Sequence, residues 1–338
     1  MSATTKGRNT RSPGGLERYN ITFSAPGTSA TVTRNTRSRR RFASWCRLFA
    51  TLAPLLYPAA PAAAPRVVAS IGPVHSLAAA VMGTLGEPRR IVRGYGSPHA
   101  YQMRPSDAAS LRDADLVLWI GPSMETFLQR PLAGVGENTR VVALSEIPGL
   151  HLLENRGADS HDAGETGIHD IHIWLSPANA GVMARAIAEE LRSLDPENAE
   201  TYETNLEQLT RRIDAMETRI KSRLAPVRTV PFVVFHDAFR YFEESFGLVS
   251  VGSVTLSPDR LPSARRIKEL REAITRSGAR CVFREPQFES ALVQVLIEET
   301  DARAGLLDPL GTEVAPGPDA YIELMDANAD SLIECLGR

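Results

Sequence analysis

The chain has 338 residues, of which 43% are hydrophobic and 23% are charged, and its formal net charge is −2. This composition is that of an ordinary globular protein, and the length suits one large or two medium-sized domains. A spanning helix needs about 20 consecutive apolar residues, and we find no such run outside the N-terminal region. The sequence therefore predicts a globular fold without a membrane-spanning helix.

The first 64 residues have the features of a basic leader followed by a signal peptide. Residues 1–47 contain ten Lys and Arg but only one acidic residue, and an apolar run over residues 48–57 follows. Such a pattern, ending in small residues of the A-x-A type, is typical of export, so we place cleavage near Ala64. A membrane anchor is the alternative, but the apolar run is short and Pro54 interrupts it. The basic region is long, which indicates either a start codon further downstream or a twin-arginine signal at residues 38–42.

Removal of this leader leaves an acidic protein with two cysteines. Residues 65–338 contain 28 basic and 39 acidic residues, so their net charge is about −11 with neutral histidines. Such a charge is unsuited to binding nucleic acid and suits a protein that handles cations. In an oxidising compartment Cys281 and Cys335 are candidates for a disulfide, with two free thiols as the alternative.

Short β-rich runs alternate with helical runs in the first half of the mature chain. We expect strands at residues 67–71, 90–93, 114–120 and 141–144, and helices at residues 74–82, at residues 105–111 and from Met124 onward. Continuous apolar strands separated by helices predict a parallel sheet that is covered on both faces.

Residues 145–170 interrupt this alternation with a polar, acidic segment that we expect to be a mobile loop. It contains three histidines, His151, His161 and His169. These histidines are candidates for accessory metal ligands, with solvated side chains as the equal alternative.

Two helices follow this segment. Ser176 and Pro177 favour a helix start directly after His172, and this helix is expected to run to about Leu194. From residue 196 to residue 226 the apolar residues recur at steps of three and four, which predicts one long amphipathic helix. At 1.5 Å per residue it spans about 40 Å, so we interpret it as a rigid connector.

The second half repeats the alternation of the first. We expect strands at residues 230–235, 248–253, 281–283 and 304–307, and helices at residues 238–246, 264–277, 288–300 and 320–335. The sequence therefore predicts an α/β protein with an N-terminal lobe at residues 65–195, the connector helix at 196–226 and a C-terminal lobe at 227–338. Each lobe has about four mainly parallel strands.

Four candidate ligands follow expected strands or begin a helix. They are His99, His172, His236 and Asp308, two from each half of the chain. Ligands of open α/β sheets collect at the carboxyl ends of strands, so these side chains could converge between the lobes. Three imidazoles and a carboxylate suit tetrahedral Zn²⁺. Each histidine alone is more often structural, and no pair has the i, i+4 spacing of a helical metal motif.

Six motifs occur in order along residues 66–338. They are His99 with RPSD at 104–107, GPSME at 121–125, HIWLSP at 172–177, FHDAFRYF at 235–242, REPQF at 284–288 and LDPLGT at 307–312. Together they closely resemble the periplasmic zinc-binding protein of bacterial high-affinity zinc ABC importers. The resemblance implies two α/β lobes that are joined by one long helix and hold a metal ion between them.

The resemblance also implies the ligands. The three histidine ligands of the family correspond to His99, His172 and His236, and related proteins have a carboxylate ligand at the position of Asp308. Zinc-binding members often have an acidic residue immediately before the first histidine, where this chain has Pro98. We therefore expect Asp308 or a water molecule in the fourth position, and we favour Asp308.

Two further features follow from the resemblance. The cysteine pair of the family corresponds to Cys281 and Cys335, which supports the disulfide. Zinc-binding members carry a long loop rich in histidine and acidic residues. Residues 151–170 occupy its place here but contain few histidines, which puts a role in gathering zinc in doubt.

The expected function is that of a periplasmic protein, a monomer, that captures Zn(II) and delivers it to an ABC permease and its ATPase in the inner membrane. Manganese-importing relatives have a Glu at the position of His236, and three imidazoles favour Zn²⁺ over Mn²⁺. One alternative is the manganese- or iron-binding sibling. The other is a zinc hydrolase with Glu285 as the base, although the chain has no H-E-x-x-H motif and no nucleophile elbow. We expect no enzymatic activity.

Overall fold

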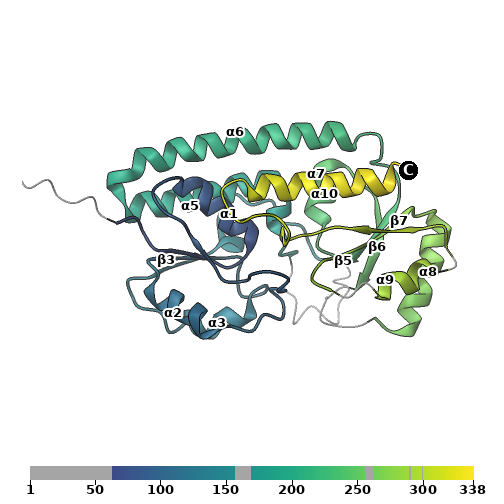
Figure 1. Cartoon of the computed structure of the whole chain (residues 1–338), viewed down its shortest axis with the longest axis horizontal. Helices are drawn as coiled ribbons and strands as arrows, with labels where there is room; N and C mark the ends of the chain where they lie inside the picture. The colour runs from purple at the N-terminus through teal and green to yellow at the C-terminus, as the bar shows by residue number, and fades with distance from the viewer. Residues whose placement is uncertain (1–62, 157–168, 256–261, 289–290, 299) are drawn as a thin grey trace, which may run out of the picture. The chain divides into compact units, whose positions relative to one another are not determined.

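Two four-stranded parallel sheets organise the chain in the computed structural model (Figure 1). The structure describes residues 63–156, 169–255 and 262–338, apart from residues 289, 290 and 299. The expected signal peptide lies almost wholly outside these residues, as does His161. Within the described ranges, no helix has the length and apolar content needed to cross a bilayer.

The first sheet has the strand order β2-β1-β3-β4, with every pairing parallel. Its strands are β1 (Val67–Ala69), β2 (Arg89–Arg90), β3 (Leu116–Trp119) and β4 (Arg140–Ala143). The helical elements of this first lobe are α1 (Gly72–Met82), α2 (Pro105–Asp113), η1 (Thr126–Leu128), α3 (Gln129–Leu132), η2 (Leu144–Glu146), η3 (Ile173–Leu175) and α5 (Pro177–Leu194). Ser176 caps α5 as expected, because its hydroxyl accepts a hydrogen bond from the Asn179 N–H.

The two central strands of this sheet, β1 and β3, are buried on both faces, as their continuous apolar sequences predict. In β3, Leu116 and Leu118 pack in a cluster with α1, α5 and the long helix, whereas Val117 and Trp119 pack in a second cluster beneath α2. Successive side chains of a strand point to opposite faces, so a strand covered on both sides must be apolar throughout.

The second sheet repeats this topology with the order β6-β5-β7-β8. Its strands are β5 (Phe232–His236), β6 (Ser250–Thr255), β7 (Cys281–Arg284) and β8 (Arg303–Leu306). The helices of this second lobe are α7 (Arg240–Phe246), α8 (Ala264–Ser277), α9 (Ala291–Ile297) and α10 (Ala320–Leu336). The predicted fold class, with two parallel four-stranded sheets and a long connecting helix, is confirmed.

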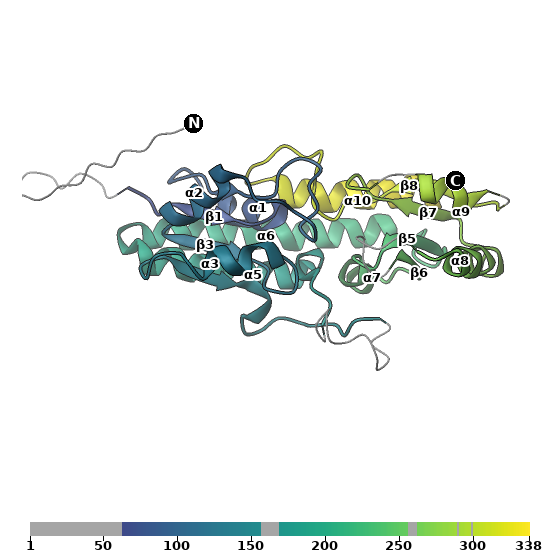
Figure 2. The same cartoon turned by 90° about the horizontal axis from the view of Figure 1, so that it is seen from below.

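The connector consists of a short turn, η4 (Pro196–Asn198), and the 26-residue helix α6 (Ala199–Leu224). The residues of its apolar stripe are all buried: Tyr202, Leu206, Leu209, Ile213, Met216, Ile220 and Leu224. The helix packs against α1 and α5 of the first lobe and against α7 of the second. Figures 1 and 2 show α10 beside it along the second lobe.

Ion pairs join α6 to α10 along this contact. Arg212 pairs with Asp319, Arg219 with Asp326, and Arg223 with Asp326 and Asp330. Because α10 also packs on α1, both helices cross from one lobe to the other. Bending between the lobes therefore requires movement of two helices rather than one.

A disulfide joins Cys281, at the start of β7, to Cys335, near the end of α10. The predicted disulfide is therefore present. It links α10, which contacts both lobes, to β7 in the interior of the second sheet.

In the first sheet the order of the strands reverses between β1 and β3, and a buried polar pair fills this point. Ser70 donates a 2.5 Å hydrogen bond to the Glu125 carboxylate, which also accepts hydrogen bonds from the N–H groups of Ile120 and Gly121. Burial raises the pKa of Glu125 to about 7, although these hydrogen bonds oppose the shift. The bond from Ser70 holds the loop after β3 against the end of β1.

We expect the stability of the Glu125→Gln variant, relative to the wild type, to increase with pH. A carboxyl group whose pKa rises from 4.5 to about 7 on folding stabilises the folded state below pH 4.5. That contribution is lost as the pH rises through 7, and this shift corresponds to about 3 kcal/mol. Gln is neutral at every pH and loses nothing. Urea unfolding of both proteins at pH 5 and pH 8 measures the change, and a pH-independent difference would contradict it.

Candidate metal centre

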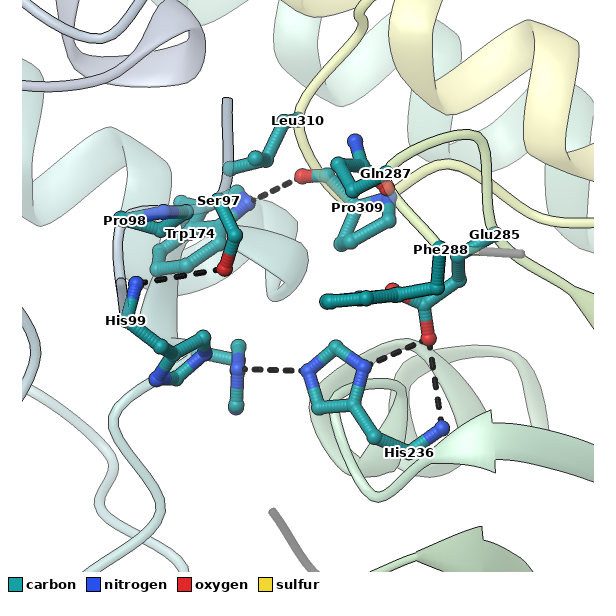
Figure 3. Close-up of a pocket in the computed structure, with 11 residues that line it drawn as sticks. Ser97, Pro98, His99, Trp174, His236, Glu285, Gln287, Phe288, Pro309 and Leu310 are labelled. Carbon is teal, nitrogen blue, oxygen red and sulfur yellow. Dashed lines mark hydrogen bonds and ion pairs between the residues drawn. The ribbon is translucent and has the colours of Figure 1, made fainter. Parts of the chain in front are cut away.

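Three histidines from separate segments meet between the lobes (Figure 3). His99 lies in the loop that follows β2, His172 immediately precedes η3, and His236 is the last residue of β5. Each offers a ring nitrogen, and these three atoms lie within 4.8 Å of one another. Two of the imidazoles are deeply buried, since His172 is 7% and His236 is 3% exposed.

His172 and His236 already have the spacing of a zinc site. Their Nε2 atoms lie 3.2 Å apart. Zinc–nitrogen bonds of about 2.0–2.1 Å that meet at a tetrahedral angle place two ligand nitrogens about 3.3 Å apart. These two imidazoles therefore need little movement to bind one ion.

Two buried carboxylates orient these imidazoles. Asp170 lies 2.8 Å from His172 Nδ1, and Glu285 lies 2.5 Å from His236 Nδ1 (Figure 3 shows the second pair). A carboxylate at Nδ1 keeps the proton on that atom, so Nε2 carries the lone pair that binds a metal. Hydrogen bonds of this kind also increase the basicity of the ligand.

Neither of these two roles was predicted from the sequence, where Asp170 was expected to be part of a loop and Glu285 to be a candidate base. The signal for Asp170 is its position two residues before a candidate ligand. The signal for Glu285 is its position after β7, the strand beside β5, because the carboxyl ends of adjacent parallel strands meet at one edge. The strand order of the second sheet reverses between β5 and β7.

Burial and charge act differently on the histidines. Burial lowers the pKa of His99 well below its ordinary value, and positive charge on His172 or His236 lowers it further. Burial alone would also lower the pKa of His236, but the charge and hydrogen bond of Glu285, with smaller contributions from Asp170 and Asp237, raise it. Three imidazoles beside two carboxylates form a site whose negative charge a divalent cation neutralises.

A small pocket surrounds the histidines, and its other walls are mostly apolar. Ser97, Pro98, Trp174, Glu285, Gln287, Phe288, Pro309 and Leu310 line it together with the three histidines. Trp174 connects the two lobes, since its Nε1 donates a 2.7 Å hydrogen bond to the backbone oxygen of Pro309. Its own backbone oxygen accepts a hydrogen bond from the Tyr321 hydroxyl.

The structure does not bring Asp308, the expected fourth ligand, into the histidine group. Its carboxylate accepts hydrogen bonds from the N–H groups of Leu310 and Thr312 and from the side chain of Gln287. These bonds hold the carboxylate inside the turn that follows β8. The end of that strand does lie near the site, but the turn directs Pro309 and Leu310 toward the histidines instead.

Two of the three candidate accessory histidines, His151 and His169, are not part of the histidine group. His151 is exposed and its ring contacts Glu244, while His169 is exposed and forms an isolated bridge with Glu154. The first part of the expected loop is held in place, because the His151 backbone forms two hydrogen bonds with the Asn179 side chain. Residues 157–168, with His161, lie outside the described residues.

Two α/β lobes with crossing helices and a cluster of histidines between them define a metal-binding protein of the solute-binding type. The family described as zinc-uptake complex component A, periplasmic (ZnuA) matches residues 67–335. The chain belongs to this family, as the sequence motifs predicted.

Individual relatives agree with this assignment. The high-affinity zinc uptake system protein ZnuA of Brucella suis biovar 1 is 41% identical over 306 residues, which cover 80% of this chain and 92% of the relative. The protein of the same name from Yersinia pestis is 36% identical over 289 residues, with 80% and 91% covered. A zinc-bound crystal structure of a ZnuA deletion mutant superposes with a TM-score of 0.70 at 27% identity, covering 81% of this chain and 98% of that one.

Proposed function

We propose that this protein is the solute-binding component of a high-affinity zinc importer and that His99, His172 and His236 hold the zinc ion. The observation that carries the proposal is the convergence of three imidazoles. Buried carboxylates orient two of them, those of His172 and His236, and the Nε2 atoms of these two rings have the spacing of zinc ligands. Relatives named as zinc uptake proteins support the choice of cargo.

The proposed cycle is capture, transport to the membrane and release. The protein acts in the periplasm as a monomer after removal of a signal peptide near Ala64, and it delivers Zn²⁺ to an ABC permease and its ATPase. Its acidic surface increases the local concentration of cations. Release requires the permease to favour a state with separated lobes, since only a difference in affinity between two states shifts their equilibrium.

We propose no enzymatic role. A zinc hydrolase needs a water molecule on the metal and a free general base near it. Glu285 was the candidate base, but it is 1% exposed and its Oε1 atom is engaged with the ring and backbone N–H of His236. In this position it supports a ligand rather than reacting with a substrate.

We assign no ligand role to Asp308, because its carboxylate is committed to the turn after β8. Water then remains the candidate for a fourth ligand. Three imidazoles with water are a softer donor set than the carboxylate-rich sets that suit Mn²⁺, which favours Zn²⁺.

Competition titration tests this proposed function. Metal-free protein is titrated with Zn²⁺ in the presence of a chelator of known affinity, and then in the presence of excess Mn²⁺. We expect one tightly bound zinc ion per chain and no displacement by a hundredfold excess of Mn²⁺. Preferential binding of Mn²⁺ would instead support the manganese-binding alternative.

We expect the Glu285→Gln variant to bind zinc about 10- to 100-fold more weakly than the wild type. Loss of an outer-shell carboxylate has effects of this size in other metal sites, because the imidazole loses its fixed tautomer and part of its basicity. Glu244→Gln is a matched control, since Glu244 also contacts a histidine ring but lies at the exposed His151. The same chelator competition measures both variants, and equal affinities would remove Glu285 from the site.

A further inference from the structure

Asp170 controls the orientation of the ligand His172 through two contacts. Its Oδ1 atom accepts hydrogen bonds from the His172 backbone N–H at 3.0 Å and from His172 Nδ1 at 2.8 Å. The residue is 3% exposed, so water does not compete freely for this oxygen. The direction of the imidazole therefore depends on where the backbone holds Asp170.

One phenol from the other lobe fixes that backbone. The Tyr241 hydroxyl donates to the Asp170 backbone oxygen at 2.9 Å and accepts from the Leu153 N–H at 3.0 Å. The Asp170 N–H in turn donates to the Leu153 backbone oxygen at 2.8 Å. The hydroxyl thus bonds to both Leu153 and Asp170, which precede and follow segment 154–169 and are also bonded to each other.

Tyr241 is suited to this position. It is 1% exposed and belongs to α7, which begins four residues after the ligand His236 and packs against η3. Burial raises the pKa of Tyr241 to about 12, so its hydroxyl remains a donor at neutral pH. Tyr241 therefore links the strand–helix unit that carries one ligand to the residue that orients another.

We infer that Tyr241 is a positioning residue of the zinc site, which holds the Asp170 carboxylate against His172 and so couples contact between the lobes to the geometry of that ligand. The inference rests on the proposed zinc-binding function. It assigns to α7 a role in zinc affinity in addition to its packing in the core.

Ion pairs near Tyr241 should keep the lobes in contact when its hydroxyl alone is removed, as in Tyr241→Phe. Arg156 contacts Asp237 at 3.0 Å and Glu243 at 2.5 Å, and both carboxylates belong to the segment that contains Tyr241. These contacts and the buried ring remain when only the hydroxyl is removed. Tyr241→Phe is therefore expected to fold and to keep the lobes in contact.

The test compares zinc affinity in Tyr241→Phe and Tyr202→Phe by chelator competition, with thermal unfolding of the metal-free proteins measured in parallel. Tyr202 is a matched control, because it lies on the connector helix α6 and its buried hydroxyl donates a 2.8 Å hydrogen bond to Asp195 at the end of α5, and neither residue lines the pocket. We expect Tyr241→Phe to weaken zinc binding about tenfold, which is the size of effect seen when residues that support a metal ligand are replaced. We expect Tyr202→Phe to leave the affinity unchanged.

A double-variant cycle separates positioning from general destabilisation. If Tyr241 acts through the Asp170 carboxylate, its substitution has little further effect on zinc affinity in an Asp170→Asn background, and the two effects do not add. Fully additive effects, or equal zinc affinities for Tyr241→Phe, Tyr202→Phe and the wild type, would overturn the inference and leave the proposed function intact. Absence of zinc binding in the wild type would overturn the proposed function itself.

Discussion

Replacement of His236 by alanine is expected to weaken zinc binding about 100- to 1,000-fold. Tetrahedral zinc sites bind with an apparent free energy of about 10–16 kcal/mol, so one ligand of four accounts for about 2.5–4 kcal/mol. The loss at this position also leaves the buried Glu285 carboxylate without the imidazole ring that it contacts. Calorimetry with chelator competition at pH 7.5 measures the effect.

His75→Ala is the matched control for this variant. His75 is also buried, at 3% exposed, but its ring contacts the backbone oxygen of Pro88 and does not line the pocket. We expect His75→Ala to lower stability and to leave zinc affinity unchanged. His99→Ala and His172→Ala should weaken binding as His236→Ala does. An unchanged affinity in any of these three variants would remove that histidine from the site.

The second large effect concerns stability. We expect replacement of Cys281 and Cys335 by alanine to reduce the free energy of unfolding by about 4 kcal/mol. The disulfide closes a loop with a sequence separation of 54 residues, and the loss of chain entropy on closing such a loop corresponds to this value. Denaturant unfolding of the oxidised wild type and the double variant measures the difference.

Zinc affinity gives the control for the disulfide. Cys281 lies at the start of β7, whereas Glu285 follows the end of that strand, so the bond is remote from the pocket. We therefore expect the folded double variant to bind zinc as the wild type does. A loss of stability below about 1 kcal/mol would show that the disulfide does not constrain the unfolded chain as inferred.

The elements with strong periodicity were predictable from the sequence. The buried stripe of α6 follows the predicted steps of three and four, and α5 and α8 have the predicted bounds because Ser176 and Ser263 supply N-caps. Weakly patterned elements were less predictable. The helix expected from Met124 is only η1 and α3, where Pro131 removes a backbone donor.

The site shows the same limit. His99, His172 and His236 were identifiable because each lies beside an apolar strand or a helix start, where ligands of α/β folds collect. Asp308 satisfied that criterion too, but position in a strand does not determine how the following turn uses a carboxylate. Asp170 and Tyr241 act through contacts between residues 71 positions apart, and no local pattern encodes such a pair.

Zinc K-edge X-ray absorption of the zinc-loaded protein measures the ligands of the proposed site. We expect nitrogen and oxygen atoms bound to the metal at about 2.0–2.1 Å, together with the more distant scattering of three imidazole rings. The His236→Ala variant should show two imidazoles under the same conditions. A sulfur shell at about 2.3 Å, or fewer than three imidazoles in the wild type, would contradict the proposed site.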